Sequence, residues 1–466
     1  MSLLDSARAK ELLSDADVTE ADVGACVGNV QAFLERYLPC FYRKEQHELA
    51  DVVVRGRLSD LQRKTSEPIA YFADRERKPV QNFVGAGKWD DEEVMAELRH
   101  HVAEKRGDPD GVLALDGSGF PKKGVESCGV ARQWCGRLGK VDNCQVGVFL
   151  AYVTARGYAP VDRRLYLPQD WAEDPQRREK CHVPEEVCFQ EGWRIGLDLI
   201  DRSAADLPFA WVVGDDEYGR ATAFRAELRL RRLTYVLDVP SNTQVRDLDE
   251  TTVTGLRRPP WRSVEEWART QPSSRWQKVK LADGSKEPRI VKILEGRVQT
   301  RDDDGRPGTV ERLVVIRTVD REPQTWYTLS NADRTKPTAK LAEVHGRRHG
   351  AEEMFEAGKG EVGLNHYEVR SWVGWHHHMT LSFLALWFVI LEKDRAGKKN
   401  PCTYSPANAR HVRAAAQCES TDARTNRQGN HSRATPQRRG PHLPLPRRDR
   451  QTPATAAGAG RIKGLQ

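Results

Sequence analysis

Two aspartates stand where apolar runs of the sequence end. Asp116 follows the run VLAL and precedes a glycine, and Asp215 follows the run WVVG. Short apolar runs of this kind predict buried strands, so both carboxylates are expected at the rim of a sheet. Carboxylate oxygens are hard ligands that suit Mg²⁺. An Asp-Gly turn also explains Asp116 by itself, and the pair of aspartates is more informative than either alone.

A third acid must come from a different part of the chain. Arg348, Glu352 and Lys359 follow one another at helical spacing, so a single helix face presents a cation, a carboxylate and a second cation. The alternative is an ordinary salt-bridge ladder on a solvated helix. Combination with the two strand-end aspartates favours the chemical interpretation of Glu352. Glu353 and Glu368 are the further candidates for the third acid.

Three such carboxylates predict metal-dependent chemistry at a phosphodiester bond. Two Mg²⁺ ions, with Mn²⁺ as a substitute, would activate an attacking oxygen and stabilise the leaving oxygen. Arg348 and Lys359 are then expected to bind the scissile or flanking phosphates by charge.

The charge of the chain is unevenly distributed. The net charge is +7, but residues 395–466 carry 15 Lys or Arg and 3 Asp or Glu, so residues 1–394 have a net charge of −5. A nucleic-acid binder is usually basic overall. Any DNA-binding surface of residues 1–394 is therefore expected to be a local patch.

Cysteines and apolar segments indicate the compartment. The nine cysteines lack the paired spacing of a zinc site, and an odd number of them fits a reducing cytoplasm. The first residues do not have the pattern of a signal peptide. The longest apolar stretch, Thr380 to Leu391, is too short to span a bilayer, so we expect a buried helix and no membrane association.

Hydrophobic periodicity divides the chain into segments. Residues 1–105 predict helices, and their basic clusters suit either a solvated face or contact with DNA phosphates. The helices expected there are Leu34–Leu38, Glu48–Leu61 and Glu92–Val102. A mixed α/β sheet is expected next, with strands at Val112–Leu115, Val146–Val153, Arg164–Leu167, Ala210–Val213 and Leu233–Val239. A strand-rich insertion follows, with strands at Trp276–Leu281, Arg289–Glu295, Val310–Thr318 and Thr325–Leu329. The last helices are expected at Ala339–Gly358 and Tyr367–Leu391.

The last 72 residues have a different composition. Only five of them are Val, Ile, Leu, Met or Phe, too few to bury a core, so we expect disorder. Two interpretations remain open: a basic arm that binds DNA without specificity, or translation out of frame, which we favour. A shifted frame would remove the original C-terminal helices and could leave the protein inactive.

Several longer motifs carry a family resemblance. They are LALDGSGFPKKG, the following GVARQWCG, VVGDDEYG, and RRHGAEEMFEAGKGEVGLNHYEVRSWVGWHHHMTL. Over about residues 20–394 the sequence resembles bacterial insertion-sequence DDE transposases, which are DDE superfamily endonucleases with an RNase H-like core and a strand-rich insertion before the glutamate.

The resemblance implies a site and a partner. Asp116, Asp215 and Glu352 become the catalytic and metal-binding acids, and the expected partner is double-stranded DNA, as transposon ends and target. The family signature Tyr-x2-Arg-x3-Glu-x6-Lys maps onto His345, Arg348, Glu352 and Lys359, with histidine in place of tyrosine. Gly350 stands where a basic or apolar residue is more usual. The DNA- or phosphate-binding residues expected are Arg348, Lys359, Lys122, Lys123 and Arg132.

The resemblance also implies an organisation. We expect a helical N-terminal DNA-binding domain (1–105), an RNase H-like core in two parts (106–240 and 336–394), a β-rich insertion (241–335) and a disordered basic tail (395–466). The insertion is expected to shape the site around the transposon end. Its tryptophans, which would stack on an unpaired base or simply fill a core, are Trp261, Trp267, Trp276 and Trp326. A homodimer in a synaptic complex, at the bacterial nucleoid, is the expected working form.

Three functions are distinguished at this stage. The first is a transposase that binds terminal inverted repeats, cleaves the ends and transfers the 3′-hydroxyls to target DNA. The second is a catalytically inactive DNA-binding relic. The third is a nuclease of the same fold that takes no part in transposition.

Overall fold

A computed structural model describes residues 20–250, 259–281, 289–302 and 304–396. The two interpretations of the basic tail fall on residues 397–466 almost entirely, and these lie outside the described residues.

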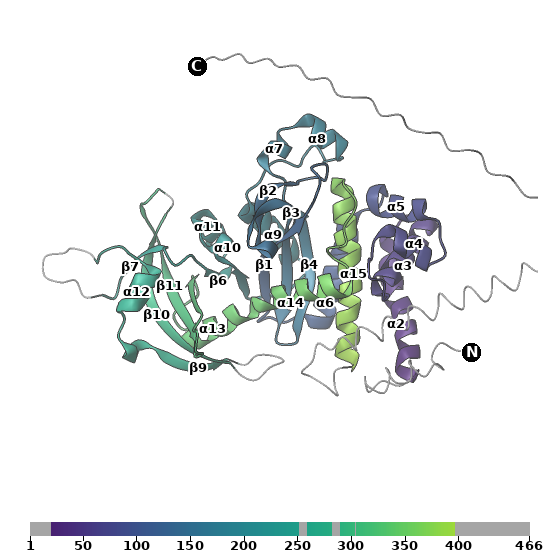
Figure 1. The fold of residues 1–466 in the computed structure, drawn as a ribbon. Coiled ribbons are helices and arrows are strands. Elements are labelled where there is room, and N and C mark those ends of the chain that lie inside the picture. Colours follow the sequence, from purple (N-terminus) through teal and green to yellow (C-terminus); the bar gives the residue numbers. More distant parts are fainter. Residues whose placement is uncertain (1–19, 251–258, 282–288, 303, 397–466) are drawn as a thin grey trace, which may run out of the picture. The chain divides into compact units, whose positions relative to one another are not determined.

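A mixed sheet forms the centre of the described chain (Figure 1). Strands β1 (Val112–Pro121), β5 (Trp211–Gly214) and β6 (Thr234–Asp238) are parallel neighbours. Strand β3 (Lys140–Thr154) runs antiparallel to β1, and β4 (Gly157–Leu165) runs antiparallel to β3. The order β4-β3-β1-β5-β6 with these directions is that of an RNase H-like sheet. It confirms the predicted fold class.

The apolar runs before the aspartates are explained by burial. The four residues that open β1 are fully buried, and the four residues of β5 are almost fully buried. Strands covered on both faces favour continuous apolar sequences rather than alternation. Asp116 does not end its strand as predicted, because β1 continues to Pro121 and pairs with β3 along its whole length. Asp215 directly follows β5, so both aspartates are attached to buried strands.

The strand-rich insertion continues the same sheet. Its strands are β7 (Gln244–Asp247), β8 (Arg262–Ser263), β9 (Gln277–Leu281), β10 (Arg289–Arg301), β11 (Pro307–Thr318) and β12 (Thr325–Ser330). Strand β12 pairs with β6, so the insertion is joined edge-on to the core strands. A separate apolar cluster includes Trp267 of helix α12 (Val264–Thr270) and gives the insertion a core of its own.

Helices cover the central strands and link them to the N-terminal segment. That segment contains α2 (Glu20–Tyr37), α3 (Lys44–Leu58), α4 (Ser66–Phe72), α5 (Arg77–Ala86) and α6 (Asp91–Arg106). The long apolar helix α15 (Trp372–Ala396) contacts α3, α5 and α6 as well as β4, and Figure 1 shows it between the sheet and the N-terminal helices. It is the buried helix that the apolar stretch predicts.

The other helices frame the sheet. They are α7 (Gln169–Ala172), α8 (Pro175–Lys180), α9 (Gly192–Ala204), α10 (Asp216–Gly219), α11 (Thr222–Leu230), α13 (Thr338–Arg347) and α14 (His349–Glu361). Helix α14 packs against β1, β3 and β4. No helix among the described residues is long and apolar enough to cross a membrane.

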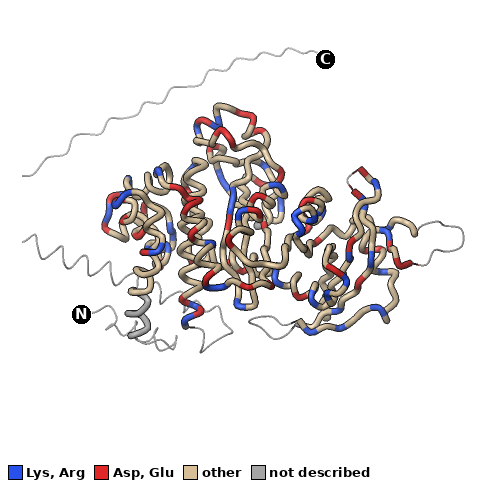
Figure 2. Tube along the Cα trace, turned by 180° about the vertical axis from the view of Figure 1, so that it is seen from behind, with Lys and Arg blue, Asp and Glu red and all other residues tan. Residues whose placement is uncertain are grey.

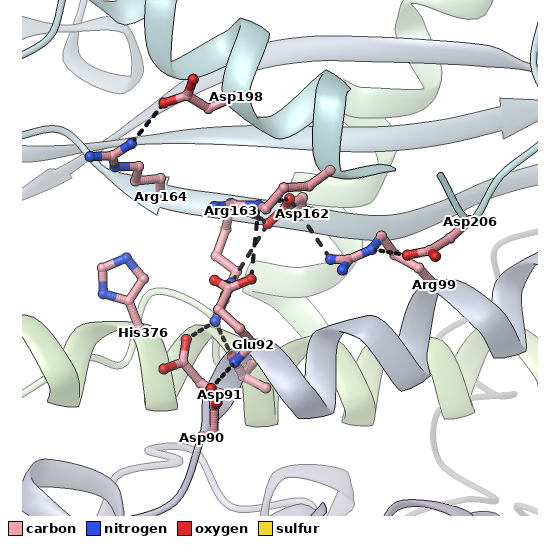
Figure 3. Close-up of polar contacts among 12 residues, drawn as sticks. Asp90, Asp91, Glu92, Arg99, Asp162, Arg163, Arg164, Asp198, Asp206 and His376 are labelled. Carbon is pink, nitrogen blue, oxygen red and sulfur yellow. Dashed lines mark hydrogen bonds and ion pairs between the residues drawn. The ribbon is translucent and has the colours of Figure 1, made fainter. Parts of the chain in front are cut away.

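A buried network of charges fastens α6 to the sheet (Figure 3). Arg163 of β4 is fully buried and pairs with Asp91 and, at 2.9 Å, with Glu92, both in the first turn of α6. Asp162, also fully buried, accepts from Arg202 of α9 at 3.0 Å. Because an unpaired buried charge is costly, this network specifies how the helical segment is attached.

Charges of both signs are spread over the described chain. Figure 2 shows Lys and Arg interspersed with Asp and Glu along the trace. This agrees with the nearly balanced charge of residues 1–394, in which a basic surface has to be local.

Candidate active site

Three aspartates occupy equivalent positions on three adjacent parallel strands. Ala114 of β1, Val213 of β5 and Val236 of β6 are paired in register, and each lies two residues before an aspartate. Residues in register on neighbouring strands point to the same face of a sheet. The aspartates of this row are Asp116, Asp215 and Asp238.

The first two aspartates repel one another's charge. Burial raises the pKa of Asp116 to about 7, with a further contribution from the negative charges of Asp215 and Glu352, while Arg348 acts in the opposite direction. Burial also raises the pKa of Asp215, against the effect of Arg348. A positive charge placed between such acids favours their ionised forms.

Arg348 is the cation that these acids share. Its Nη2 lies 2.9 Å from Oε1 of Glu352, and its Nε lies 3.5 Å from Oδ2 of Asp238. Burial lowers the pKa of Arg348, but the charges of Asp238 and Glu352, followed by those of Asp116 and Asp215, outweigh burial and the pKa is raised. One guanidinium thus connects the strand-end row with helix α14.

The Glu352 carboxylate is ionised and already has two partners. It accepts from Nδ1 of His349 at 2.8 Å and pairs with Arg348, and these two partners lower its pKa, with His349 contributing most. Its side chain remains 45% exposed. The predicted third acid is therefore partly exposed, and its carboxylate contacts Arg348 and His349 at the start of α14.

Helix α14 approaches the sheet closely through a glycine. A Cβ at Gly350 would lie 2.9 Å from both methyl carbons of Val153 on β3, so a side chain there would push the helix outward. Further along, Nζ of Lys359 donates to Oγ of Ser118 at 2.9 Å. Ser118 is two residues beyond Asp116 on β1, so both cations of the predicted helix face lie close to the predicted acids.

Comparison with known proteins assigns this arrangement to a family. A family model described as DDE superfamily endonuclease matches residues 36–293, more than half of the chain. The chain belongs to the DDE superfamily endonucleases. The matched range includes Asp116, Asp215 and Asp238 and ends before Glu352.

Individual relatives agree with this membership. The chain is 24% identical over 332 residues to a probable transposase for insertion sequence element IS701 from Microchaete diplosiphon, covering 68% of this chain and 77% of that protein. This similarity confirms the resemblance to insertion-sequence transposases. A solved synaptic complex of piggyBac transposase with hairpin DNA matches with a TM-score of 0.40 and 10% identity, over 88% of this chain and 80% of that one.

The donor set of this DDE endonuclease has the right chemistry for divalent metal. All three predicted ligands are carboxylates, which suit Mg²⁺, and Asp116 is a carboxyl whose ionisation its neighbours oppose. Within the described ranges, however, no three His, Cys, Asp or Glu side chains are already grouped to hold an ion. Glu352 is instead paired with Arg348 and His349.

The other predicted phosphate-binding residues lie just after β1 and on β2 (Ala131–Cys135), which pairs with β3. Lys122 directly follows β1, and its Nζ donates to the Tyr367 carbonyl at 2.9 Å; burial lowers its pKa to about 8. Lys123 and Arg132 are exposed. All three follow Asp116 in the sequence, before the end of β2.

The alternative third acids face other partners. Oε1 of Glu353 lies 3.9 Å from Nε2 of His349, and Glu368 pairs at 3.1 Å with Arg63 of the N-terminal segment. Glu352, by contrast, shares Arg348 with the aspartate row. Its position favours Glu352 as the third acid.

The insertion tryptophans divide into two kinds. Trp267 is buried and donates from Nε1 to Asp247 at 2.7 Å, so it fills the insertion core and is not available for base stacking. Trp326 is partly buried, and its ring centroid lies 5.7 Å from that of His345, next to the site. Trp261 and Trp276 are partly buried and stack with arginines.

Asp238 is the residue of this site that the sequence reasoning missed. It ends the run TYVLD in the same way that Asp116 and Asp215 follow their apolar runs. The sequence therefore carries the same signal at Asp238, an aspartate after an apolar run, but the prediction assigned the third acid to Glu352. His345, which replaces the signature tyrosine, places Nε2 3.0 Å from Oδ1 of Asp238.

Proposed function

We propose that this DDE endonuclease is a transposase that binds the terminal inverted repeats of an insertion sequence, cleaves the ends by phosphodiester hydrolysis and transfers the 3′-hydroxyls to target DNA. The observation that carries the proposal is the in-register pair Asp116 and Asp215, which shares Arg348 with Glu352. Family membership supports the endonuclease chemistry, and the similarity to an insertion-sequence transposase supports the substrate.

Each residue of the site has a role in this proposal. Asp116, Asp215 and Glu352 would bind two Mg²⁺ ions, or Mn²⁺ in their place; bound metal activates the attacking oxygen and stabilises the leaving oxygen. Arg348 and Lys359 would bind the phosphate groups beside the scissile bond, because both cations lie beside the acids. Lys122, Lys123 and Arg132 would bind phosphates further along the DNA.

We propose the corresponding organisation of the chain. Residues 1–105 bind DNA, residues 106–240 and 336–394 form the catalytic core, and residues 241–335 form the insertion beside it. Cleavage of two ends together calls for a homodimer in a synaptic complex on bacterial DNA.

A plasmid assay tests this function. Supercoiled DNA carrying the sequences that flank the gene on both sides is incubated with the full chain and Mg²⁺ or Mn²⁺. We expect nicking at the ends and joining to target, both lost in Asp116→Asn and Asp215→Asn and retained in Asp216→Asn, which removes an exposed neighbouring carboxylate.

The other outcomes identify the alternatives. Binding of the flanking DNA without any cleavage would leave an inactive relic. Equal cleavage of plasmids that lack the flanking sequences would indicate a nuclease that takes no part in transposition.

A further inference from the structure

Asp238 lies at the site but outside the predicted triad. It is 8% exposed at the end of β6, one residue beyond the register pair of Gly214 and Leu237 that joins β6 to β5. Helix α10 packs so closely on it that a Cβ at Gly219 would lie 1.8 Å from the Asp238 carbonyl oxygen. The main chain at Asp238 is therefore packed tightly against α10.

Two side chains of the segment before Glu352 converge on Asp238. His345 in the last turn of α13 lies 3.0 Å from Oδ1, and Arg348, at the break between α13 and α14, lies 3.5 Å from Oδ2. The negative charge of Asp238 also raises the pKa of Arg348, and it does so more than the charge of Glu352. Arg348 thus has two carboxylate partners, one on the sheet and one on the helix.

The second partner matters when Glu352 becomes a ligand. In that step Glu352 has to give up the guanidinium it now contacts at 2.9 Å. A partly buried guanidinium without a carboxylate partner is unfavourable, so a chain without Asp238 would keep Glu352 on Arg348, whose side chain is 19% exposed. With Asp238 in place, Arg348 retains a partner and stays beside the acids.

We propose that Asp238 is a positioning residue that holds Arg348 on the sheet and thereby releases Glu352 to bind metal. The inference rests on the proposed metal-dependent function. Both carboxylate oxygens of Asp238 face side chains, Oδ1 facing His345 and Oδ2 facing Arg348, and two strand spacings, about 10 Å, separate Asp238 from Asp116.

A double-mutant cycle, in which the measured quantity is metal affinity, tests this role. Mn²⁺ affinity of the full chain is measured by calorimetry, without DNA, for wild type, Asp238→Asn, Arg348→Gln and the double variant. We expect Asp238→Asn to weaken Mn²⁺ binding about tenfold when Arg348 is present, which corresponds to about 1.4 kcal/mol. In the Arg348→Gln background the same change should weaken Mn²⁺ binding about threefold or less, because Arg348 then no longer competes with the metal for Glu352.

Asp216→Asn is the matched control for charge. It removes a carboxylate that acts on Asp215 but pairs with Arg220 instead of Arg348. It measures the through-space effect of losing one negative charge, which we expect to equal the small effect of Asp238→Asn in the Arg348→Gln background. Asp238→Glu keeps the charge, so its Mn²⁺ affinity should stay within a few-fold of the wild-type value. This variant also tests the inference if Asp238→Asn fails to fold.

Two results would overturn the inference. An equal loss of affinity from Asp238→Asn in both backgrounds would make Asp238 a direct ligand or a general structural residue, and a loss in Asp238→Glu as large as that of an uncharged side chain would exclude a charge-based role. Failure of the proposed function would be seen separately. The wild-type chain would then bind Mn²⁺, and the variants would show the expected affinities, but no variant or wild-type chain would cleave DNA.

Discussion

Arg348 is the residue on which the four carboxylates of the site depend. It contacts Glu352 and Asp238 directly and acts by charge on Asp116 and Asp215. Because positive charge near an acid favours its ionised form, this guanidinium limits the repulsion among the acids. Metal would compete with it for Glu352, so metal binding and the position of Arg348 are linked.

The raised pKa of Asp116 predicts a pH-dependent effect of its removal. The pKa of about 7 in the folded chain lies above the unfolded value near 4, so ionising Asp116 costs stability, and the cost grows as pH rises from about 4 to 7. Without divalent metal, Asp116→Asn should therefore raise Tm strongly at pH 8 and little at pH 5. The upper bound is about 4 kcal/mol, from three pKa units.

Thermal unfolding at the two pH values measures this difference. Asp216→Asn controls for the loss of one negative charge near the site. An Asp116→Asn effect of equal size at pH 5 and pH 8 would show that crowding of the acids does not destabilise the folded chain.

Most residues of the proposed site were predicted from the sequence, but their contacts were not. Asp116, Asp215, Arg348, Glu352 and Lys359 follow from residue type and spacing. The in-register position of Asp238 depends on which strands are neighbours, and β5 and β6 are adjacent only through the sheet order. The engagement of Glu352 by His349 depends on side-chain geometry that spacing does not fix.

At the scale of elements, helix α14 carries the third acid into place. Gly350 permits its contact with Val153, and Lys359 bonds to Ser118 on β1. The sequence predicted one helix from Ala339 to Gly358, whereas the structure breaks it at Arg348 into α13 and α14. Helical periodicity continues across the break, so the break leaves no signal in the sequence.

Gly350→Ala tests the close approach of α14. The added Cβ would lie 2.9 Å from the methyl carbons of Val153, and overpacking of this kind costs about 1–3 kcal/mol. Gly360→Ala in the same helix meets nothing within 4 Å and should be neutral or stabilising by up to about 1 kcal/mol. Urea unfolding of both variants gives the comparison, and equal stability of the two would contradict close packing at Gly350.

Strands were predicted both from buried apolar runs in the core and from alternation in the insertion, where β9 to β12 lie at the expected positions. The runs at β1, β3, β5 and β6 were located because continuous burial selects apolar residues. The strand expected at Arg164–Leu167 instead lies earlier, as β4 (Gly157–Leu165). Its buried Asp162 and Arg163 form ion pairs with helices that are distant in the sequence. Because charged residues usually indicate an exposed segment, the sequence did not predict a buried strand there.

For the molecule as a whole, this buried ion network joins segments far apart in sequence (Figure 3). Arg163→Met leaves Asp91, Glu92 and Asp162 without that partner, and breaking a buried pair costs about 3–5 kcal/mol. We expect a large drop in Tm and exposure of helix α6 to hydrogen exchange. Arg306→Met, which breaks an exposed pair with Asp304, should leave both measurements unchanged; a similar small effect of Arg163→Met would mean that the network does not fasten the helix.

The most direct test of the central claim compares two adjacent glutamates. Cleavage rates of DNA carrying the flanking ends are measured for Glu352→Gln and Glu353→Gln in the full chain with Mg²⁺. If Glu352 completes the site with Asp116 and Asp215, its variant loses about a hundredfold or more in rate, while Glu353→Gln, facing His349 at 3.9 Å, cleaves at nearly the wild-type rate. Undiminished cleavage by Glu352→Gln would contradict the assignment of the active site.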